Sequence, residues 1–185
     1  MTAMTANPRV LQTVRPEHQR RALLWKMIAV VAVALAGAGG TVAHAQAGPI
    51  EDLSSFPRGK LEIADGKKVK HVFDVWLADS PRRQSQGLMF VRSLPAMRGM
   101  LFVHESPKQL SMWMKNTYIP LDMVFIDANG RIQQIIEQTT PHSLSTISSK
   151  DPALAVLEIA GGEAKRLGLH AGQRVLHTAL VGYHP

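Results

Sequence analysis

The chain has 185 residues, of which 21 are basic and 14 acidic, and it contains no cysteine. The missing cysteine excludes disulfides, thiolate metal sites, a cysteine nucleophile and a lipid anchor at a cleavage-site cysteine. The formal net charge of +7 belongs largely to the first 45 residues, which hold five basic side chains and one acidic one. Residues 46–185 keep 16 basic and 13 acidic side chains, so their net charge of +3 gives no support for a nucleic-acid partner.

The first 45 residues have the organisation of an export signal. An apolar run of 12 residues, Met27–Ala38, follows a basic segment and precedes the small-x-small sequence Ala43-His44-Ala45. A membrane span needs roughly 18 or more apolar residues, so we predict a signal peptide cleaved after Ala45 and a periplasmic or secreted protein. A retained leader that anchors the chain in the membrane is the alternative. The pair Arg20-Arg21 also fits a twin-arginine signal, which leaves the export route open.

Residues 46–57 are predicted to be a linker, and residues 58–185 a single β-rich domain. The apolar runs Leu61–Ala64 and Val69–Leu77 flank Asp65-Gly66, a dipeptide typical of hairpin turns. The stretch from Ser80 to Gly87 has an N-cap residue, a proline at the first helical position and a glycine stop, so we expect a short helix there.

The remaining apolar runs predict further short strands. These cover residues 100–104, 110–115, 121–126, 131–138, 154–160 and 174–180, with Asn129-Gly130 as a tight hairpin turn. The Ser/Thr-rich stretch Pro141–Pro152 is predicted to be a surface loop and a lid, and Glu163–Leu167 a second short helix ending at Gly168. Many short strands with few helices favour a mainly β fold, either a compact β-sandwich or a partly open barrel.

Polar and charged residues among these apolar strands form the candidate site. Alternation on a strand over residues 110–115 would place Met112 and Met114 on one face and Trp113 on the other. Two carboxylates, Asp122 and Glu158, stand within strongly apolar strands, where an unpaired charge costs several kcal/mol. We therefore predict a ligand-binding rim at 113–122 and 158, made of Trp113, Lys115, Asn116, Thr117, Asp122 and Glu158.

A purely structural interpretation of the same residues stays open. Lys115, Asp122 and Glu158 would then form ion pairs or cap backbone groups, because structural networks also hold charges among apolar side chains.

Other chemistries have weaker support in the sequence. Met112 and Met114, with His104, could hold Cu(I), although methionine more often fills an apolar core. The histidines beyond residue 45 are scattered and lack zinc-site spacing. Ser111 lies four residues before Lys115, but that spacing on a strand gives no catalytic geometry, and no nucleophile elbow or phosphate loop is present. We expect no cofactor.

Several strings together resemble the family called domain of unknown function 192. They are Gly87–Phe90, Leu94-Pro95, Gly99–Val103, Trp113–Thr117, Ile119–Asp122, Phe125–Asp127, Gly130, Leu157-Glu158 and the closing glycines Gly168 and Gly172. The resemblance covers about residues 58–178. It implies a compact β-sandwich-like domain with short helices, often exported from bacteria, and no established activity. The segment before Gly87 tends to be acidic in the family, whereas here it reads Arg82-Arg83-Gln84.

The leading hypothesis is an envelope domain that binds a small molecule or an envelope protein through the rim at 113–122 and 158, with membrane contact only through an uncleaved leader. One alternative is a non-covalent hydrolase or lyase with Asp122 or Glu158 as general base and with Lys115 and Asn116 stabilising charge. Another is a Cu(I)-binding protein that uses Met112 and Met114. The sequence leaves open whether there is any catalysis.

Overall fold

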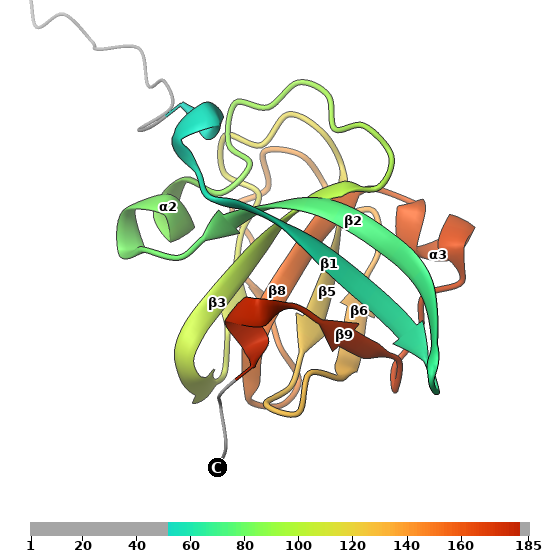
Figure 1. Cartoon of the computed structure of the whole chain (residues 1–185). Helices are drawn as coiled ribbons and strands as arrows, with labels where there is room; N and C mark the ends of the chain where they lie inside the picture. Colours follow the sequence, from blue (N-terminus) through green and yellow to red (C-terminus); the bar gives the residue numbers. More distant parts are fainter. Residues whose placement is uncertain (1–51, 182–185) are drawn as a thin grey trace, which may run out of the picture. The chain divides into compact units, whose positions relative to one another are not determined.

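The computed structural model describes residues 52–181, and the predicted signal peptide and its cleavage site lie outside them. The nine strands are β1 (Arg58–Asp65), β2 (Lys68–Ala78), β3 (Arg98–Lys108), β4 (Ser111–Met112), β5 (Leu121–Ile126), β6 (Ile132–Ile136), β7 (Ile147–Ser148), β8 (Ala153–Ala160) and β9 (Arg174–Leu176). Two short α-helices, α2 (Pro81–Gln86) and α3 (Glu163–Leu167), and the 3-10 turns η1 (Leu53–Ser55) and η2 (Thr178–Leu180) complete the described elements (Figure 1).

Seven strands form one curled sheet in the order β6-β5-β8-β3-β2-β1-β9, and β4 pairs with β7 in a separate small sheet. All neighbours in the large sheet are antiparallel except β2 and β3, which the connection through α2 makes parallel. The two edges approach each other at an isolated bridge between Arg131 and Arg174. The sheet is therefore curled but not closed, which confirms the mainly β prediction and fits a partly open barrel.

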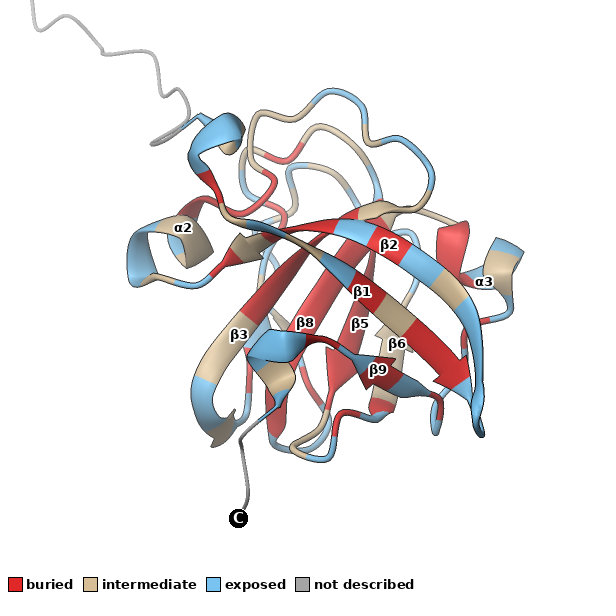
Figure 2. Ribbon diagram, viewed as in Figure 1, coloured by how far each residue is buried: buried red, intermediate tan, exposed pale blue. Residues whose placement is uncertain are grey.

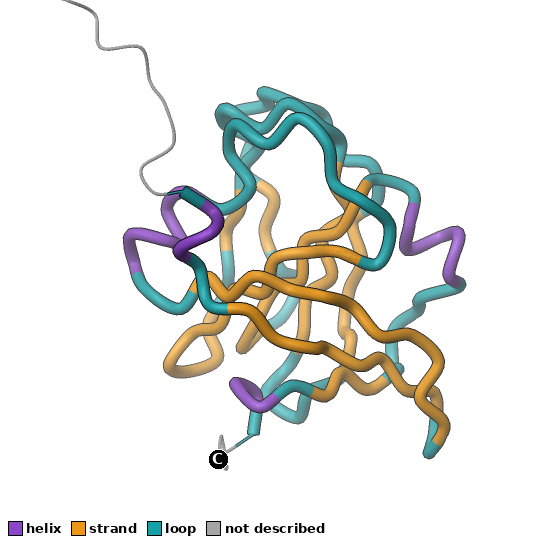
Figure 3. Tube along the Cα trace, turned by 45° about the horizontal axis from the view of Figure 1, so that its top comes forward, coloured by secondary structure: helices purple, strands orange, loops and turns teal. Residues whose placement is uncertain are grey.

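Both faces of the sheet are covered by apolar side chains. Residues at odd positions of β8, such as Leu157 and Ile159, belong to the cluster inside the curl. Val156, on the opposite face, belongs to an outer cluster together with Met100 and Phe102 of β3. Helix α2 and long connections cover this outer face, so the sheet is red, meaning buried, along its centre (Figure 2). The loops gather at one end of the sheet (Figure 3).

The structure confirms most predicted elements and corrects three. The strand expected over residues 174–180 ends at Leu176, and Thr178–Leu180 form the 3-10 turn η2. The strand expected over residues 110–115 ends at Met112, because the backbone turns at Asn116, whose φ is 55°, and the Thr117 N–H donates to the Met114 carbonyl. The loop Pro141–Pro152 contains β7 and is held by backbone hydrogen bonds, including one from the Met114 N–H to the Ser143 carbonyl.

Two further observations concern the start of the described region and the length of its helices. The last part of the segment predicted to be a linker forms the turn η1, and Phe56 after it is buried against the outer cluster. Within residues 52–181, no helix is long and apolar enough to cross a membrane.

Candidate functional site

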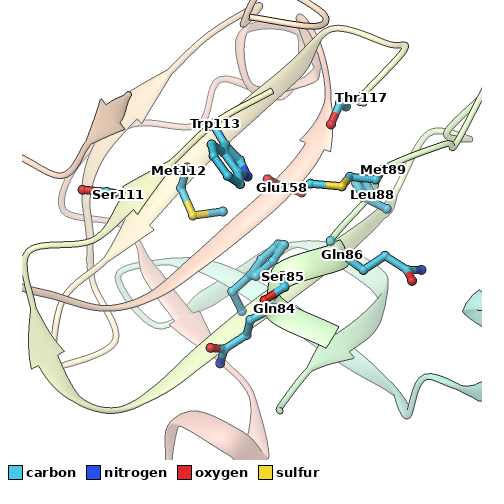
Figure 4. Close-up of a pocket in the computed structure, with 12 residues that line it drawn as sticks. Gln84, Ser85, Gln86, Leu88, Met89, Ser111, Met112, Trp113, Thr117 and Glu158 are labelled. Atoms are coloured by element: carbon cyan, nitrogen blue, oxygen red, sulfur yellow. The ribbon is translucent and has the colours of Figure 1, made fainter. Parts of the chain in front are cut away.

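A small polar pocket lies on the outer face of the sheet, between the end of α2 and the segment that follows β4. Its volume is about 70 Å³, and it is lined by Gln84, Ser85, Gln86, Gly87, Leu88, Met89, Phe102, Ser111, Met112, Trp113, Thr117 and Glu158 (Figure 4). A water molecule takes about 30 Å³ in the liquid, so the pocket has space for a group of a few heavy atoms and not for a large molecule.

Glu158 is the ionisable side chain in this pocket. It lies in the centre of β8 opposite Met100 of β3 and Met123 of β5, and only 4% of it is exposed. Among the described residues, no hydrogen bond or ion pair reaches its carboxyl group. Burial raises the pKa of Glu158 from its ordinary value of 4.5 to about 8, because the apolar surroundings disfavour the charged form.

Helix α2 supplies one wall of the pocket. Its N-cap is Ser80, whose hydroxyl accepts from the Arg83 N–H, and it ends at Gly87 with φ 52° and ψ −138°. A Cβ at Gly87 would meet the Phe102 ring at 2.9 Å and would lie 3.9 Å from a carboxylate oxygen of Glu158. The glycine therefore lets the chain turn directly beside the buried carboxyl group.

The opposite wall comes from the segment after β4. Half of the Trp113 side chain is exposed, and Thr117 is buried with its hydroxyl donating to the Lys115 carbonyl. Trp113 and Met89 lie on either side of Glu158 in the close-up (Figure 4). Three of the six predicted rim residues, Trp113, Thr117 and Glu158, therefore line one pocket.

The other three predicted residues lie outside the pocket lining. The Lys115 ammonium group is 5.3 Å from the centre of the Trp113 ring, on the exposed side of the segment. Asn116 forms the turn, where its carbonyl accepts from the Phe90 N–H and its amide lies 4.0 Å from the Met89 sulfur. Asn116 thus holds the two walls of the pocket together.

Asp122 has a structural role at a different place. Its carboxylate accepts from the backbone N–H groups of Gln138, Gly162 and Ala164 at 2.8–2.9 Å. It is opposite Ile159 on β8, whereas Glu158 is opposite Met123, so the two carboxyl groups point to opposite faces of the sheet. The capping interpretation therefore holds for Asp122, and the two acids do not converge.

The predicted copper ligands are not brought together. Met112 lines the pocket, but the Met114 sulfur is buried elsewhere, 3.1 Å from the Thr139 hydroxyl. His104 lines a neighbouring hollow, and burial lowers its pKa. Within the described part of the chain, no cluster of His, Asp and Glu side chains could hold a metal ion.

The predicted lid does not cover this site either, since none of the residues 141–152 lines the pocket. The wall that sequence reasoning missed is Gln84–Met89. The signal for it was the resemblance string beginning at Gly87, which follows directly on the predicted helix.

The fold and the site define a small β-domain with a buried carboxyl group at a pocket on the outer face of a partly open sheet. The chain belongs to the DUF192 family, described as "Uncharacterized ACR", whose model matches residues 62–177.

Two solved structures are similar to the chain. One is a proposed transcription regulator from Sinorhizobium meliloti, 38% identical, with 68% of this chain and 97% of that chain covered and a TM-score of 0.65. The other is a protein of unknown function from Novosphingobium aromaticivorans, 34% identical, with 76% and 100% covered and a TM-score of 0.65. No functionally curated protein matches the chain.

Proposed function

We propose that the protein is a binding domain of the cell envelope that captures a small ligand, or a side chain of a partner protein, in the pocket at Glu158. The observation that carries this proposal is the buried carboxyl group of Glu158, which has no hydrogen-bond or ion-pair partner among residues 52–181. A carboxyl group in such a place costs free energy, and a ligand that pairs with it recovers part of that cost.

A thermal-shift screen of the purified protein against a chemically diverse library of small polar compounds tests the proposal. Binding compounds should raise the unfolding midpoint of the wild type and not that of the Glu158→Gln variant. Glu105→Gln is the matched control, because Glu105 is exposed and does not line the pocket. Midpoint shifts that are the same in all three proteins would contradict binding at Glu158.

A general-base role for Glu158 is the second candidate function. Its raised pKa, about 8, lies near neutral pH, where a general acid or base is most effective. The proposed charge-stabilising partners Lys115 and Asn116 do not line the pocket, so the binding role has the stronger support. Turnover of a bound compound that disappears in Glu158→Gln, with binding retained, would favour catalysis.

The location in the envelope rests on the signal peptide proposed for residues 1–45. Sequencing the N-terminus of the exported protein tests it, and the first residue should be Gln46. An uncleaved N-terminus on a membrane-bound protein would support the retained anchor instead.

We propose no nucleic-acid partner, although the relative from Sinorhizobium meliloti is described as a proposed transcription regulator. The net charge of +3 over residues 46–185 gives the weak electrostatic attraction expected of a near-neutral domain. A gel-shift titration with random-sequence duplex DNA at 150 mM salt should show no complex at micromolar protein, and a salt-dependent complex would overturn this view.

A further inference from the structure

We propose that the pocket at Glu158 binds the ammonium or guanidinium group of an organic cation. This inference rests on the proposed binding function and adds the chemical class of the ligand. It follows from a comparison of two sets of hydrogen-bonding groups in the lining: those that already have partners within the protein and those that remain available to a ligand.

Three polar side chains of the lining use their donors within the protein, and the Ser111 hydroxyl shares a hydrogen bond with the Ser148 hydroxyl at 3.3 Å. The Gln84 amide donates to the carbonyls of Ala78 and Val103, the Ser85 hydroxyl to Pro81, and the Thr117 hydroxyl to Lys115. What remains on these three side chains is acceptor capacity on their oxygens.

The rest of the lining adds further acceptors. The thioethers of Met89 and Met112 accept hydrogen bonds but cannot donate, and Glu158 contributes a carboxyl group. The indole N–H of Trp113 is a donor, and no hydrogen bond within the described residues uses it. The acceptors named here outnumber that donor, so the lining favours a ligand with several N–H donors, as an organic cation has.

Two features favour a charged donor over a neutral one. A cation beside Glu158 offsets the cost of burying the ionised carboxylate, which no residue of the described chain does. The half-exposed Trp113 ring lies beside Glu158, and an indole face attracts ammonium and guanidinium groups, as the Lys115 ammonium group 5.3 Å from the ring centre illustrates (Figure 4).

The size of the pocket limits the head group of the ligand, and a neighbouring hollow leaves space for the rest of it. The volume of about 70 Å³ suits a head group of a few heavy atoms. A second hollow of about 200 Å³ shares the lining residues Gln84, Phe102, Ser111 and Met112, so the remainder of the ligand has space beside the head group. The head group can therefore belong to a free small amine or to a lysine or arginine side chain of a partner.

Binding of a cation should depend on pH through Glu158. No other ionisable side chain lines the pocket in the described structure. Charged or titratable groups on the elements packed around it are Arg82 and Arg83 on α2, Arg98, His104, Glu105 and Lys108 on β3, Asp122 on β5, and Lys115 after β4. Arg83 pairs with Asp79, and the Arg98 guanidinium lies over the Trp76 ring. Asp122 faces the other side of the sheet.

The test is a titration of the purified full-length protein, labelled with ¹³C in its methionine methyl groups, with methylguanidinium and propylammonium chloride. Met89 and Met112 report on the pocket, and Met97, which packs against the inner cluster, reports on the remaining core. We expect shifts confined to the two pocket methyl groups, with an affinity that rises roughly tenfold per pH unit from pH 6 to about 8. N-methylurea, a neutral analogue of similar shape, and acetate should bind at least tenfold more weakly.

Two variants separate the cation site from a merely structural role of Glu158. Glu158→Gln should lose the pH dependence and at least tenfold in affinity for both cations, while an unchanged Met97 signal shows that the core is intact. Trp113→Leu, at an exposed position that the fold tolerates, should weaken binding about threefold without changing the pH dependence. Unchanged cation affinity in both variants would refute the proposal.

The source of the cation is decided by two peptides. Tighter binding of Gly-Arg-Gly or Gly-Lys-Gly than of the free cations indicates a partner side chain, and the reverse order indicates a small amine. If N-methylurea or acetate shifts the pocket methyl groups and the cations do not, the cation proposal is wrong and the binding function stands. If no probe of any class shifts them up to 100 mM, both proposals are overturned.

Discussion

Two buried carboxyl groups on neighbouring strands have different hydrogen-bonding surroundings in this fold. Asp122 accepts hydrogen bonds from three backbone N–H groups. Glu158 has no donor among the described residues, and burial alone acts on it. The difference comes from the alternation of side chains along β5 and β8, which turns one acid toward the start of α3 and the other toward the pocket.

The Glu158→Gln substitution should stabilise the protein at alkaline pH. The pKa of Glu158 rises on folding from 4.5 to about 8, so between these values the unfolded chain loses a proton that the folded chain keeps. The free energy of unfolding of the wild type then falls by up to ~1.4 kcal/mol per pH unit through this window and is flat above it. Gln keeps a neutral group of similar shape, so its advantage should grow to a few kcal/mol at pH 8.5 and be small at pH 5.

Urea denaturation of both proteins at pH 5, 7 and 8.5 measures this difference. Burial lowers the pKa of His104 and of His177, and both histidines are present in both proteins, so their effect cancels in the comparison. An advantage of the variant that is the same at all three pH values would contradict the assignment.

The Asp122→Asn substitution should be strongly destabilising. Asn has one side-chain acceptor oxygen in place of two and no charge, so at least one of the N–H groups of Gln138, Gly162 and Ala164 loses its partner. Hydrogen bonds to charged groups contribute about 1.5–3 kcal/mol each, and we expect a loss of at least ~2 kcal/mol in the free energy of unfolding. Urea denaturation measures it, and Asp65→Asn, at an exposed strand end, is the control with little expected effect.

At the scale of the elements, the end of α2 decides the shape of the pocket. The helix is only six residues long, and it ends at Gly87, whose φ of 52° is not helical and whose missing Cβ leaves room for the Phe102 ring. The chain then continues through Leu88, which is buried, and Met89, which lines the pocket. A helix continued by one more residue would remove this wall.

A comparison of two helix-ending glycines tests that role. Gly87 and Gly168 both have positive φ, 52° and 65°, but a Cβ at Gly168 meets nothing within 4 Å. Gly168→Ala should cost ~1 kcal/mol for the backbone conformation alone, and Gly87→Ala at least ~1 kcal/mol more for the contact with Phe102. Thermal unfolding of the two variants measures the difference, and equal losses would show that Phe102 moves aside freely.

For the whole molecule, the curled sheet depends on one contact between its edges. The bridge of Arg131 with Arg174 and three backbone hydrogen bonds connect the segment 130–132 to the segment 172–175 there. In one of these bonds the Val175 N–H donates to the Gly130 carbonyl at 2.7 Å. Val175 and Ile132 both belong to the inner cluster, so this contact also closes the apolar core at that end.

The Gly130→Ala substitution should weaken this edge contact. Gly130 has φ 71°, and a Cβ there would lie 3.0 Å from the Val175 carbonyl oxygen, which is tighter than side chains normally come to backbone. We expect a loss of ~2 kcal/mol in the free energy of unfolding and faster hydrogen exchange at the Val175 amide. Gly66→Ala is the matched control, since it has φ 59° in an open hairpin turn and should lose only ~1 kcal/mol without a change at Val175.

The sequence by itself determined the local elements of this protein. Turn dipeptides such as Asp65-Gly66, the capping residues Ser80 and Gly87, and the apolar run Leu121–Ile126 act over a few residues, so the hairpin, α2 and β5 could be predicted. The position of Glu158 among apolar residues could also be predicted from the sequence, because the alternation along β8 is a property of the strand alone.

Only the tertiary structure decided what surrounds each carboxyl group. The backbone donors that hold Asp122 come from residues 16 to 42 positions away, and the walls beside Glu158 come from α2 and the segment after β4. Strand order and register determine which N–H groups or side chains lie next to a given acidic residue. Neither can be predicted from the spacing of residues along the chain. For the same reason Trp113 and Thr117 lie beside Glu158, while Lys115, between them in the chain, does not line the pocket.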